Sequence, residues 1–165
     1  MFKIEEIYNK AINSVIKESE DDYQLQGKIR WKGLMIDIEN KKGSYRTGKD
    51  ADNKSWRTYM NASYGRIRGT STNHDNEEVD IYYLSNKDVP FVYQIFQNKK
   101  TKSGQFLNEL DEYKYIIGAA SEKDAKKLYL SQYDSPKFYG GIKSIPVNEF
   151  VSHIKDYLRK KDNNV

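Results

Sequence analysis

An acidic run at residues 74–81, HDNEEVDI, crowds four carboxylates into a polar stretch just before an apolar one. Carboxylates this close repel one another and raise one another's pKa values unless cations separate them. A turn followed by the first residue of a strand can aim Asp75, Glu77 and Asp80 at one point. Such an anionic, all-oxygen set suits a hard cation such as Mg²⁺, which keeps several waters. The run therefore predicts either a solvated turn or a magnesium-binding loop.

Two further groups of polar residues fall where strands are expected to begin or end. Glu39 closes an apolar run and Arg46 follows it, while Asp111, Glu112 and Lys114 adjoin another apolar run. A polyphosphate bound beside a metal would also need cationic and phenolic donors for its oxygens. The candidates for this role are Arg46, Tyr64, Lys114, Tyr133 and Lys137.

The middle of the chain is predicted to be β. Strand-like runs lie at residues 34–39, 79–84, 91–96 and 113–118. A polar hairpin tip at residues 49–54 leads to Trp56, Tyr59 and Met60, which can alternate into a core. Residues 98–110 have the composition of a polar connection between two strands.

Amphipathic helices are predicted on either side of these strands. Helical spacing of apolar residues marks residues 1–17 and 150–158, and a capping box at residues 121–124 starts a third helix. This order of elements indicates an α+β domain, a small curled sheet or barrel with helices packed on it. We divide the chain into an N-terminal amphipathic helix and linker, residues 1–26, and one domain, residues 27–165.

Composition excludes several classes of function. The 28 Lys and Arg against 24 Asp and Glu give a net charge of +4, but the charge is scattered, so we do not expect a nucleic-acid partner. The absence of cysteine excludes disulfides, thiolate metal sites and cysteine nucleophiles. No stretch approaches the roughly 20 apolar residues of a membrane span. We expect a cytoplasmic protein that contacts no membrane.

A series of short motifs occurs in one order along the chain. The motifs are Ile38-Glu39-Asn40, Gly43-Ser44-Tyr45-Arg46, Lys49 to Lys54, Trp56, Tyr64-Gly65-Arg66-Ile67, Asp75 to Ile81, Asp111-Glu112-Tyr113-Lys114 and Tyr129-Leu130-Ser131-Gln132-Tyr133. In this order they resemble the soluble inorganic pyrophosphatase family, and most closely the pyrophosphatase-like domain of phage and mobile-element multidomain proteins. The resemblance covers residues 33–158, and a phage-encoded chain would act in the host cytoplasm.

The resemblance implies a small five-stranded OB-like β-barrel with flanking α-helices, and hydrolysis of pyrophosphate or a related phosphoanhydride. It implies Mg²⁺, with Mn²⁺ as an alternative, held by Glu39, Asp75, Glu77, Asp80, Asp111 and Glu112. Asp75, Glu77 and Lys114 would be catalytic, with Glu77 as the general base that deprotonates the attacking water. Arg46, Tyr64, Lys114, Tyr133 and Lys137 would bind the substrate. The resemblance leaves undecided whether the chain forms a homo-oligomer.

Four positions depart from the family pattern. One is Arg66, which replaces the second tyrosine of a Tyr-Gly-Tyr segment, and its two interpretations are a phosphate contact or an exposed side chain. Asn76 replaces a glycine of the acidic loop, Glu77 is longer by a methylene than the family's aspartate, and Phe96 stands where these domains usually place an acid. Catalytic carboxylates act within a fraction of an ångström, so a longer side chain matters. Two hypotheses therefore remain: a Mg²⁺-dependent hydrolase, or a catalytically impaired domain that binds a phosphate-rich ligand or a protein partner. Nucleic-acid binding on an OB-like barrel is a third class.

Overall fold

The structure, a computed structural model, describes residues 25–70, 78–86 and 88–163. The described chain is a mixed α+β fold, as the order of elements predicts. Seven strands form one sheet in the order β1-β2-β5-β6-β8-β7-β9, and β3 and β4 form a separate hairpin. The predicted N-terminal helix lies outside the described residues, so the division at residues 26 and 27 stays a prediction.

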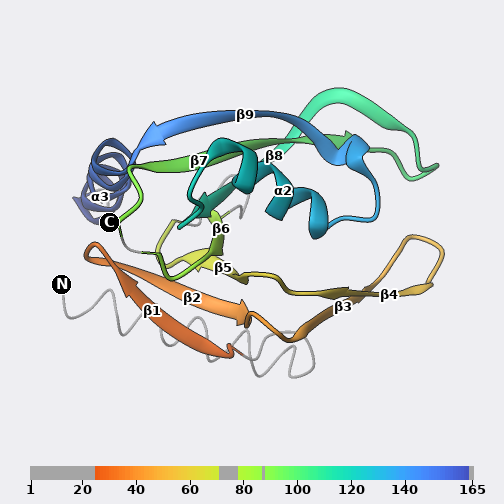
Figure 1. Cartoon of the computed structure of the whole chain (residues 1–165), viewed down its shortest axis with the longest axis horizontal. Coiled ribbons are helices and arrows are strands. Elements are labelled where there is room, and N and C mark those ends of the chain that lie inside the picture. The colour runs from red at the N-terminus through yellow and green to blue at the C-terminus, as the bar shows by residue number, and fades with distance from the viewer. Residues whose placement is uncertain (1–24, 71–77, 87, 164–165) are drawn as a thin grey trace.

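The strand bounds follow the predicted apolar runs closely in the centre of the sheet. The strands are β1 (Gly27–Trp31), β2 (Leu34–Asn40), β3 (Tyr45–Lys49), β4 (Ser55–Tyr59), β5 (Ser63–Ile67), β6 (Asp80–Tyr83), β7 (Phe91–Lys100), β8 (Phe106–Ile117) and β9 (Tyr139–Pro146). Strands β6 and β8 pair in parallel, and the other neighbours in the two sheets are antiparallel. Figure 1 shows the large sheet curling, with β7, β8 and β9 above β1 and β2.

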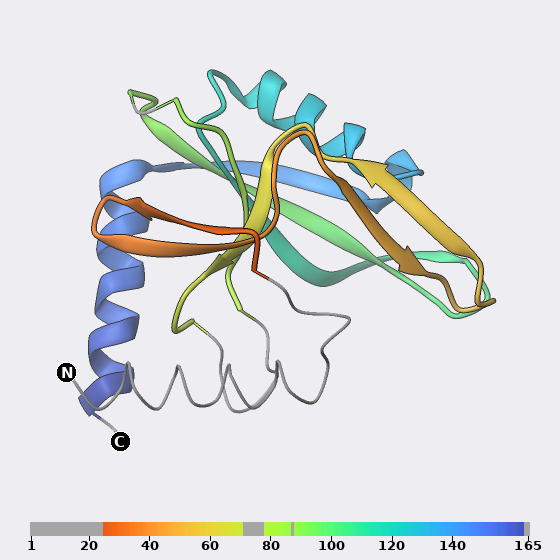
Figure 2. The same cartoon turned by 90° about the horizontal axis from the view of Figure 1, so that it is seen from below.

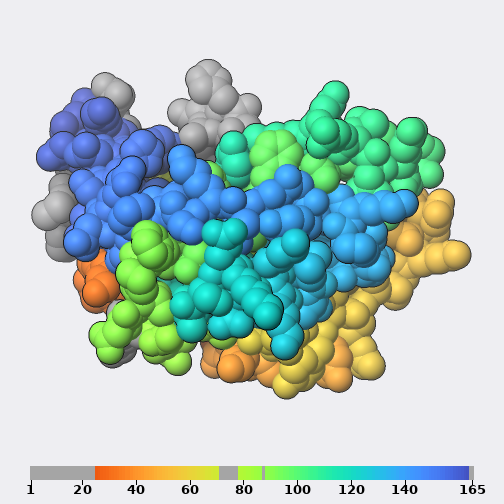
Figure 3. All heavy atoms as spheres, turned by 45° about the horizontal axis from the view of Figure 1, so that its top comes forward, coloured from red at the N-terminus to blue at the C-terminus, as the bar shows by residue number. Residues whose placement is uncertain are grey.

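Two hairpins extend from the same end of the molecule. The β3–β4 hairpin and the tip of the β7–β8 hairpin point the same way, and α3 lies at the opposite end (Figures 1 and 2). In the space-filling view the two tips, coloured yellow and teal, again stand at one end (Figure 3). Side chains between these two arms therefore belong to residues far apart in the sequence.

The alternation of side chains along each strand builds a core on each face of the curled sheet. In β2, Leu34, Ile36 and Ile38 face one side while Asp37 and Glu39 face the other. One buried cluster includes Ile36, Ile67, Ile81, Phe150 and Ile154. The second includes Tyr64, Tyr82, Ile95, Ile116, Leu128 and Tyr129. The first uses residues of α3 (Val147–Asn163), and the second uses residues of α2 (Glu122–Ser131).

The helix predicted from the capping box is confirmed. Ser121 has extended dihedral angles, and its hydroxyl oxygen accepts a 3.1 Å hydrogen bond from the backbone N–H of Asp124. A short 3₁₀ helix, η1 (Pro136–Phe138), then leads into β9. Within the described residues, no helix has the length and apolar content to cross a membrane.

A buried ion pair that the sequence analysis did not predict joins β2 to the segment after β5. Asp37 is fully buried, and its Oδ1 accepts a 2.7 Å hydrogen bond from Nη2 of Arg68. The Nε of Arg68 lies 3.2 Å from both carboxylate oxygens. This paired charge holds the end of β5 against the second strand, because a buried carboxylate needs its partner in place.

Several predictions about the elements are corrected by the structure. The large sheet has seven strands rather than five, and β1 was not predicted. Residues 98–110 are mostly the ends of β7 and β8, because polar side chains suit both faces of a projecting arm. Met60 is buried as predicted, but Trp56 and Tyr59 are 39% and 50% exposed rather than in the core.

Candidate functional site

A row of charged side chains crosses the centre of the large sheet. In the order of the strands, the row consists of Glu39 on β2, Arg66 on β5, Asp80 on β6, and Lys114 and Glu112 on β8. Arg66 is opposite Asp80, and Asp80 is opposite Lys114, in the strand pairing. Directly opposed residues point to the same face, so register alone brings these acids and bases together.

Lys114 lies at the centre of this row. Its Nζ is 2.8 Å from Asp80 Oδ2, from Glu112 Oε1 and from the hydroxyl oxygen of Tyr64. The residue is only 4% exposed. Burial alone would lower the pKa of Lys114, but the tyrosine and carboxylate oxygens around it raise that pKa well above its ordinary value. Lys114 is therefore a fixed positive charge at neutral pH.

Arg66 connects two further carboxylates at the other end of the row. Its Nε lies 2.7 Å from Glu78 Oε2, and its Nη1 lies 3.6 Å from Glu39 Oε1. Arg66 replaces a tyrosine of the family motif, and here it joins β5 to the acidic run. The guanidinium thus supplies positive charge beside two of the acids.

Burial opposes ionisation of Glu39 and Asp80 in this row and of Glu78 beside it. It raises the pKa of Glu39 and of Asp80, although Arg66 and Lys114 respectively act against that shift. Burial raises the pKa of Glu78 to about 7, with Arg66 lowering it and the neighbouring carboxylates raising it further. Arg66 and Lys114 therefore do not fully compensate the negative charge of Glu39, Glu78 and Asp80.

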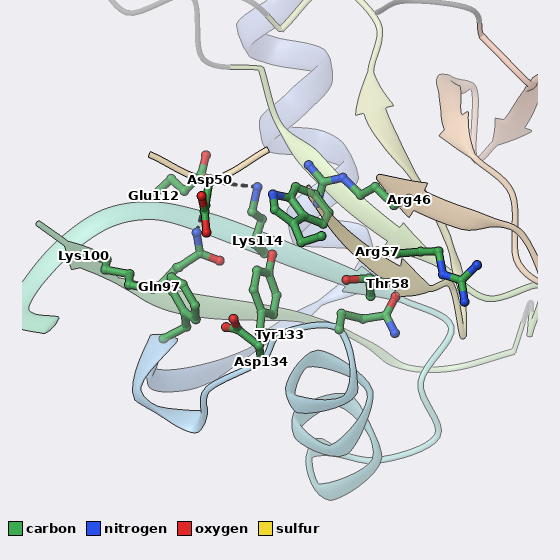
Figure 4. A pocket seen from close by; sticks show the side chains of 13 residues that line it. Arg46, Asp50, Arg57, Thr58, Gln97, Lys100, Glu112, Lys114, Tyr133 and Asp134 are labelled. Carbon is green, nitrogen blue, oxygen red and sulfur yellow. Dashed lines mark hydrogen bonds and ion pairs between the residues drawn. The ribbon is translucent and has the colours of Figure 1, made fainter. Parts of the chain in front are cut away.

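A cavity of about 390 Å³ opens beside the charged row, between the two projecting hairpins. Its lining includes Arg46, Trp56 and Thr58 from the β3–β4 hairpin, Gln97, Glu112 and Lys114 from β7 and β8, and Gln132, Tyr133 and Phe138 from the end of α2 to η1. Figure 4 shows Lys114, Glu112, Arg46 and Tyr133 turned toward this space from different elements. Cations and a phenol thus converge on one hollow, as binding of a phosphate oxyanion requires.

Arg46 is held in the cavity wall by aromatic rings. Its guanidinium carbon lies 4.5 Å from the ring centroid of Tyr64 and 5.8 Å from that of Trp56, in the range of cation–π contacts. The hydroxyl of Tyr64 contacts Lys114, so one tyrosine touches both cations. The two positive charges are therefore held on the same side of the cavity.

A chain of two hydrogen bonds, from Tyr129 to Gln97 and from Gln97 to Glu112, holds the Glu112 side chain in place. Gln97 is 6% exposed, and its Nε2 donates to Glu112 Oε1 at 3.2 Å. Its Oε1 accepts a 2.8 Å hydrogen bond from the hydroxyl of Tyr129. The hydroxyls of Tyr82 and Tyr133 lie 3.0 Å apart nearby. Gln97 and Tyr129 thus fix the position of Glu112, a charged residue that lines the cavity.

Some predicted site residues lie elsewhere. Asp75 and Glu77 lie outside the described residues. Asp111 is exposed and is the extra residue of a β-bulge, because Gln97 pairs with Glu112 while the next residue of β7 pairs with Leu110. Of these two adjacent acids, Glu112 is paired across the strands and forms an ion pair with Lys114, so it belongs to the charged row and Asp111 does not. Lys137 is exposed and is not part of the cavity lining.

Phe96 does not take the place of an acid in the cavity. It pairs with Tyr113 across β7 and β8, and the two rings meet edge to face with centroids 6.1 Å apart. Gln97 and Glu112 form the adjacent pair, on the opposite face. The side chain that β7 presents to the cavity is therefore Gln97, a neutral residue.

Four residues of this arrangement were not predicted in these positions from the sequence. Arg66 was interpreted as a phosphate contact or an exposed residue rather than as an ion-pair partner. Glu78 and Tyr129 stood within quoted motifs without a role, and Gln97 received none either. Register could have indicated Arg66, since it falls on the same side of its strand as Tyr64. The contact between Tyr129 and Gln97 joins a helix to a strand 32 residues away, and no local pattern reveals it.

A profile of the inorganic pyrophosphatase family matches residues 16–155, most of the chain. The chain belongs to the inorganic pyrophosphatase family. The resemblance drawn from the motifs is thus confirmed, while the link to phage proteins stays a prediction. No curated protein and no solved structure shows significant similarity to this pyrophosphatase-family chain.

The donor chemistry of the row fits the magnesium ion that the family implies. Its acids offer only carboxylate oxygens, the ligands that Mg²⁺ prefers, and burial raises the pKa values of Glu39, Glu78 and Asp80 as it does when compensating positive charge is insufficient. Among residues 25–70, 78–86 and 88–163, no three acids or imidazoles form a ligand cluster by themselves. Asp75 and Glu77 would have to complete the set.

Proposed function

We propose that this pyrophosphatase-family chain is a Mg²⁺-dependent hydrolase of inorganic pyrophosphate or a related phosphoanhydride. The observation that supports this function best is the position of Lys114. This buried, permanently charged residue contacts Asp80, Glu112 and Tyr64 and faces a cavity whose wall also carries Arg46. Carboxylates for a metal and cations for phosphate oxygens therefore adjoin a single space.

Arg46 and Lys114 would bind the substrate. The guanidinium can donate hydrogen bonds to two phosphate oxygens at once. The three donors of Lys114 already contact Asp80, Glu112 and Tyr64, so Lys114 would attract phosphate through its charge. Because both cations lie in a partly water-excluded wall, their attraction for the charge that develops on the leaving phosphate is stronger than in bulk water. Tyr64 positions the pair, and Tyr133 offers a further hydroxyl to the cavity.

Glu39, Asp80 and Glu112 would hold the metal together with Asp75 and Glu77. When bound, Mg²⁺ lowers the pKa of a coordinated water and neutralises phosphate oxygens. Glu77 keeps its predicted role as the base that accepts a proton from the attacking water. Mn²⁺ could take the same place, since it also prefers oxygen ligands.

The central strands of the sheet would correspond to the family's barrel. The charged row and Gln97 come from β2, β5, β6, β8 and β7, which are five consecutive neighbours in the sheet. We infer that these five strands are the expected OB-like barrel, while β1 and β9 add to its edges. A location in the cytoplasm accords with this function, because pyrophosphate is released there by biosynthetic reactions.

One observation favours the alternative, a domain that binds a phosphate-rich ligand without hydrolysing it. Arg66 lies 2.7 Å from Glu78 and 3.6 Å from Glu39, so a side chain already supplies positive charge where the family would use a metal. Gln97 likewise adds no carboxylate from β7. The alternative thus predicts binding of phosphate compounds with no turnover.

Release of phosphate from pyrophosphate separates the two functions. The purified chain should release phosphate in the presence of Mg²⁺ or Mn²⁺ and stop when a chelator is added. Calorimetry with methylenediphosphonate, which has no hydrolysable bridge, measures binding in parallel. Binding without phosphate release under any of these conditions would favour the alternative and contradict the hydrolase.

A further inference from the structure

The cavity is larger and more varied than an inorganic substrate needs. Pyrophosphate has no apolar part, yet the wall of this 390 Å³ cavity includes the rings of Trp56 and Phe138 beside its cations. Cavities of this size with aromatic walls and a few polar groups are typical sites for organic ligands. The charged row accounts for only one side of the lining.

Trp56 is exposed inside this cavity because of a small residue opposite it. Trp56 on β4 pairs with Gly48 on β3, and a Cβ atom on Gly48 would overlap the indole ring. The glycine therefore lets the ring lie across the strand, where the side chain remains 39% exposed. An exposed indole in a cavity wall offers a flat surface on which an aromatic ligand can stack.

Trp56 and the phosphate-binding cations form a continuous series. Arg46 lies between the rings of Trp56 and Tyr64, and the Tyr64 hydroxyl contacts Lys114. A ligand with its phosphates at Lys114 and Arg46 would therefore extend toward the indole. The series matches a molecule that carries phosphates at one end and an aromatic ring at the other.

Gln132 supplies a second, independent feature of the wall. The residue is 5% exposed, and its Nε2 donates to the backbone oxygen of Tyr59 at 3.2 Å and to Ser131 Oγ at 3.1 Å. Ser131 donates its own proton to the backbone oxygen of Leu128, so it must accept from Gln132. These contacts fix the orientation of the amide.

The amide oxygen of Gln132 is left for a ligand. This buried Oε1 has no hydrogen-bond partner among the described residues, and Gln132 lines the cavity. Ionised pyrophosphate offers only acceptors, so it cannot satisfy this oxygen. A sugar hydroxyl or an amino group can, because each donates a hydrogen bond.

We propose that the cavity binds a nucleoside polyphosphate, with the phosphates at Lys114 and Arg46, the base stacked on Trp56, and a hydroxyl or amino group donating to Gln132. This inference rests on the proposed function, whose substrate class it specifies. Hydrolysis would add one water across a phosphoanhydride bond, giving a nucleoside phosphate and inorganic phosphate or pyrophosphate, with the two water protons shared between the products.

Binding can be measured without catalysis. The probes are an adenosine triphosphate analogue with methylene bridges in place of both anhydride oxygens, and methylenediphosphonate as its inorganic counterpart, both with Mg²⁺. The chain has two tryptophans, and Trp31 is only 6% exposed. Quenching of tryptophan fluorescence by the nucleotide analogue would therefore report on Trp56. We expect the nucleotide to quench and methylenediphosphonate to leave the fluorescence nearly unchanged.

Substitutions test the stacking. Trp56→Leu should weaken binding of the nucleotide analogue by about 10- to 100-fold, the effect of losing one base-stacking contact. It should weaken the calorimetric affinity for methylenediphosphonate much less, because Arg46 keeps its closer contact with Tyr64. Tyr59→Leu is the matched control, since Tyr59 is a half-exposed aromatic residue of the same strand on the opposite face of the hairpin. Gln132→Met should weaken nucleotide binding several-fold.

Two results would overturn the inference. One is failure of the nucleotide analogue to bind, and the other is an affinity for it that Trp56→Leu leaves unchanged. Far-UV circular dichroism shows whether each variant is folded. If pyrophosphate is not hydrolysed while the nucleotide analogue binds through Trp56, the hydrolase proposal fails and the ligand class stands.

Discussion

Lys114 and Asp80 are directly opposed on two parallel strands and form an ion pair of 2.8 Å. The pair joins β6, which begins within the acidic run, to β8, a strand that lines the cavity. Lys114 also contacts Glu112, so one buried cation holds two carboxylates in place. The stability of the charged row and its proposed chemistry therefore depend on the same residue.

Replacing Lys114 by methionine should destabilise the protein strongly. The variant would leave Asp80 and Glu112 close together with no cation between them. We expect the free energy of unfolding in urea to fall by about 2–3 kcal/mol, somewhat less than for fully buried pairs because both carboxylates are partly exposed.

A double variant separates charge from packing in this case. Adding Asp80→Asn to Lys114→Met removes one of the two carboxylate charges that have lost their cation, so part of the lost stability should return. Lys127→Met, at an exposed position of α2, serves as the control and should change stability by less than about 0.5 kcal/mol. Equal losses for Lys114→Met and Lys127→Met would contradict the role assigned to Lys114.

Glu78 should make the stability of the metal-free protein depend on pH. Its pKa rises from 4.5 to about 7 on folding, mainly through burial. The folded state then holds a proton that the unfolded state has lost, so stability is greatest below pH 4.5 and falls as the pH rises to about 7. The loss for this one group should be at most about 3 kcal/mol.

Urea unfolding of the chelator-treated protein between pH 5 and pH 8 measures this dependence. Glu78→Gln removes the titrating group and should flatten the slope over that range. Glu149→Gln, which changes an exposed carboxylate of α3, should not. A slope that persists unchanged in Glu78→Gln would show that another group is responsible.

Gly65 should tolerate no side chain. It lies between Tyr64 and Arg66, and a Cβ atom there would overlap the backbone carbonyl of Asp37 on the neighbouring strand. Since backbone cannot move aside as a flexible side chain can, Gly65→Ala should cost about 3 kcal/mol or more, or prevent folding. Gly27→Ala provides the comparison, because its Cβ would meet only Lys41 at 3.5 Å. Similar thermal stability of both variants would contradict this account.

The sequence predicted the elements whose signals are local. The capping box at Ser121 and the strand-like composition of residues 34–39 predicted the correct helix and strand, because both signals depend on neighbouring residues. The arms of β7 and β8 were missed, since their polar residues are paired across strands rather than buried. The exposure of Trp56 depends on Gly48 across the hairpin, and the periodicity of the sequence does not predict such a cross-strand contact.

The sequence predicted most of the charged residues of the candidate site, but only some of the residues that contact them. Asp80, Glu112 and Lys114 come together because strand register aligns them, whereas the family resemblance implied a shared site without the register. Whether Asp111 or Glu112 joins the row depends on a β-bulge, and bulges have no reliable sequence signal. The neutral residues that support Glu112, Gln97 and Tyr129, are distant from it in sequence, so only the three-dimensional structure reveals these contacts.

Magnesium should stabilise the folded protein. A ligand that binds only the native state raises stability with its concentration, by roughly 3 kcal/mol at a hundred times the dissociation constant. The melting temperature should therefore rise as Mg²⁺ is titrated into the chelator-treated chain. Glu39→Gln should weaken this response, because it removes one proposed ligand. No change in melting temperature at millimolar Mg²⁺ would contradict the proposed metal site.

The most direct test of the hydrolase proposal is the rate of phosphate release from pyrophosphate with Mg²⁺, compared between the unmodified chain and Asp80→Asn. Losing one metal ligand that also contacts Lys114 should lower kcat by at least about 100-fold. Asp88→Asn, an exposed aspartate in the loop before β7, should retain full activity. Phosphate release that is absent from the unmodified chain, or equal in Asp80→Asn, would contradict the account.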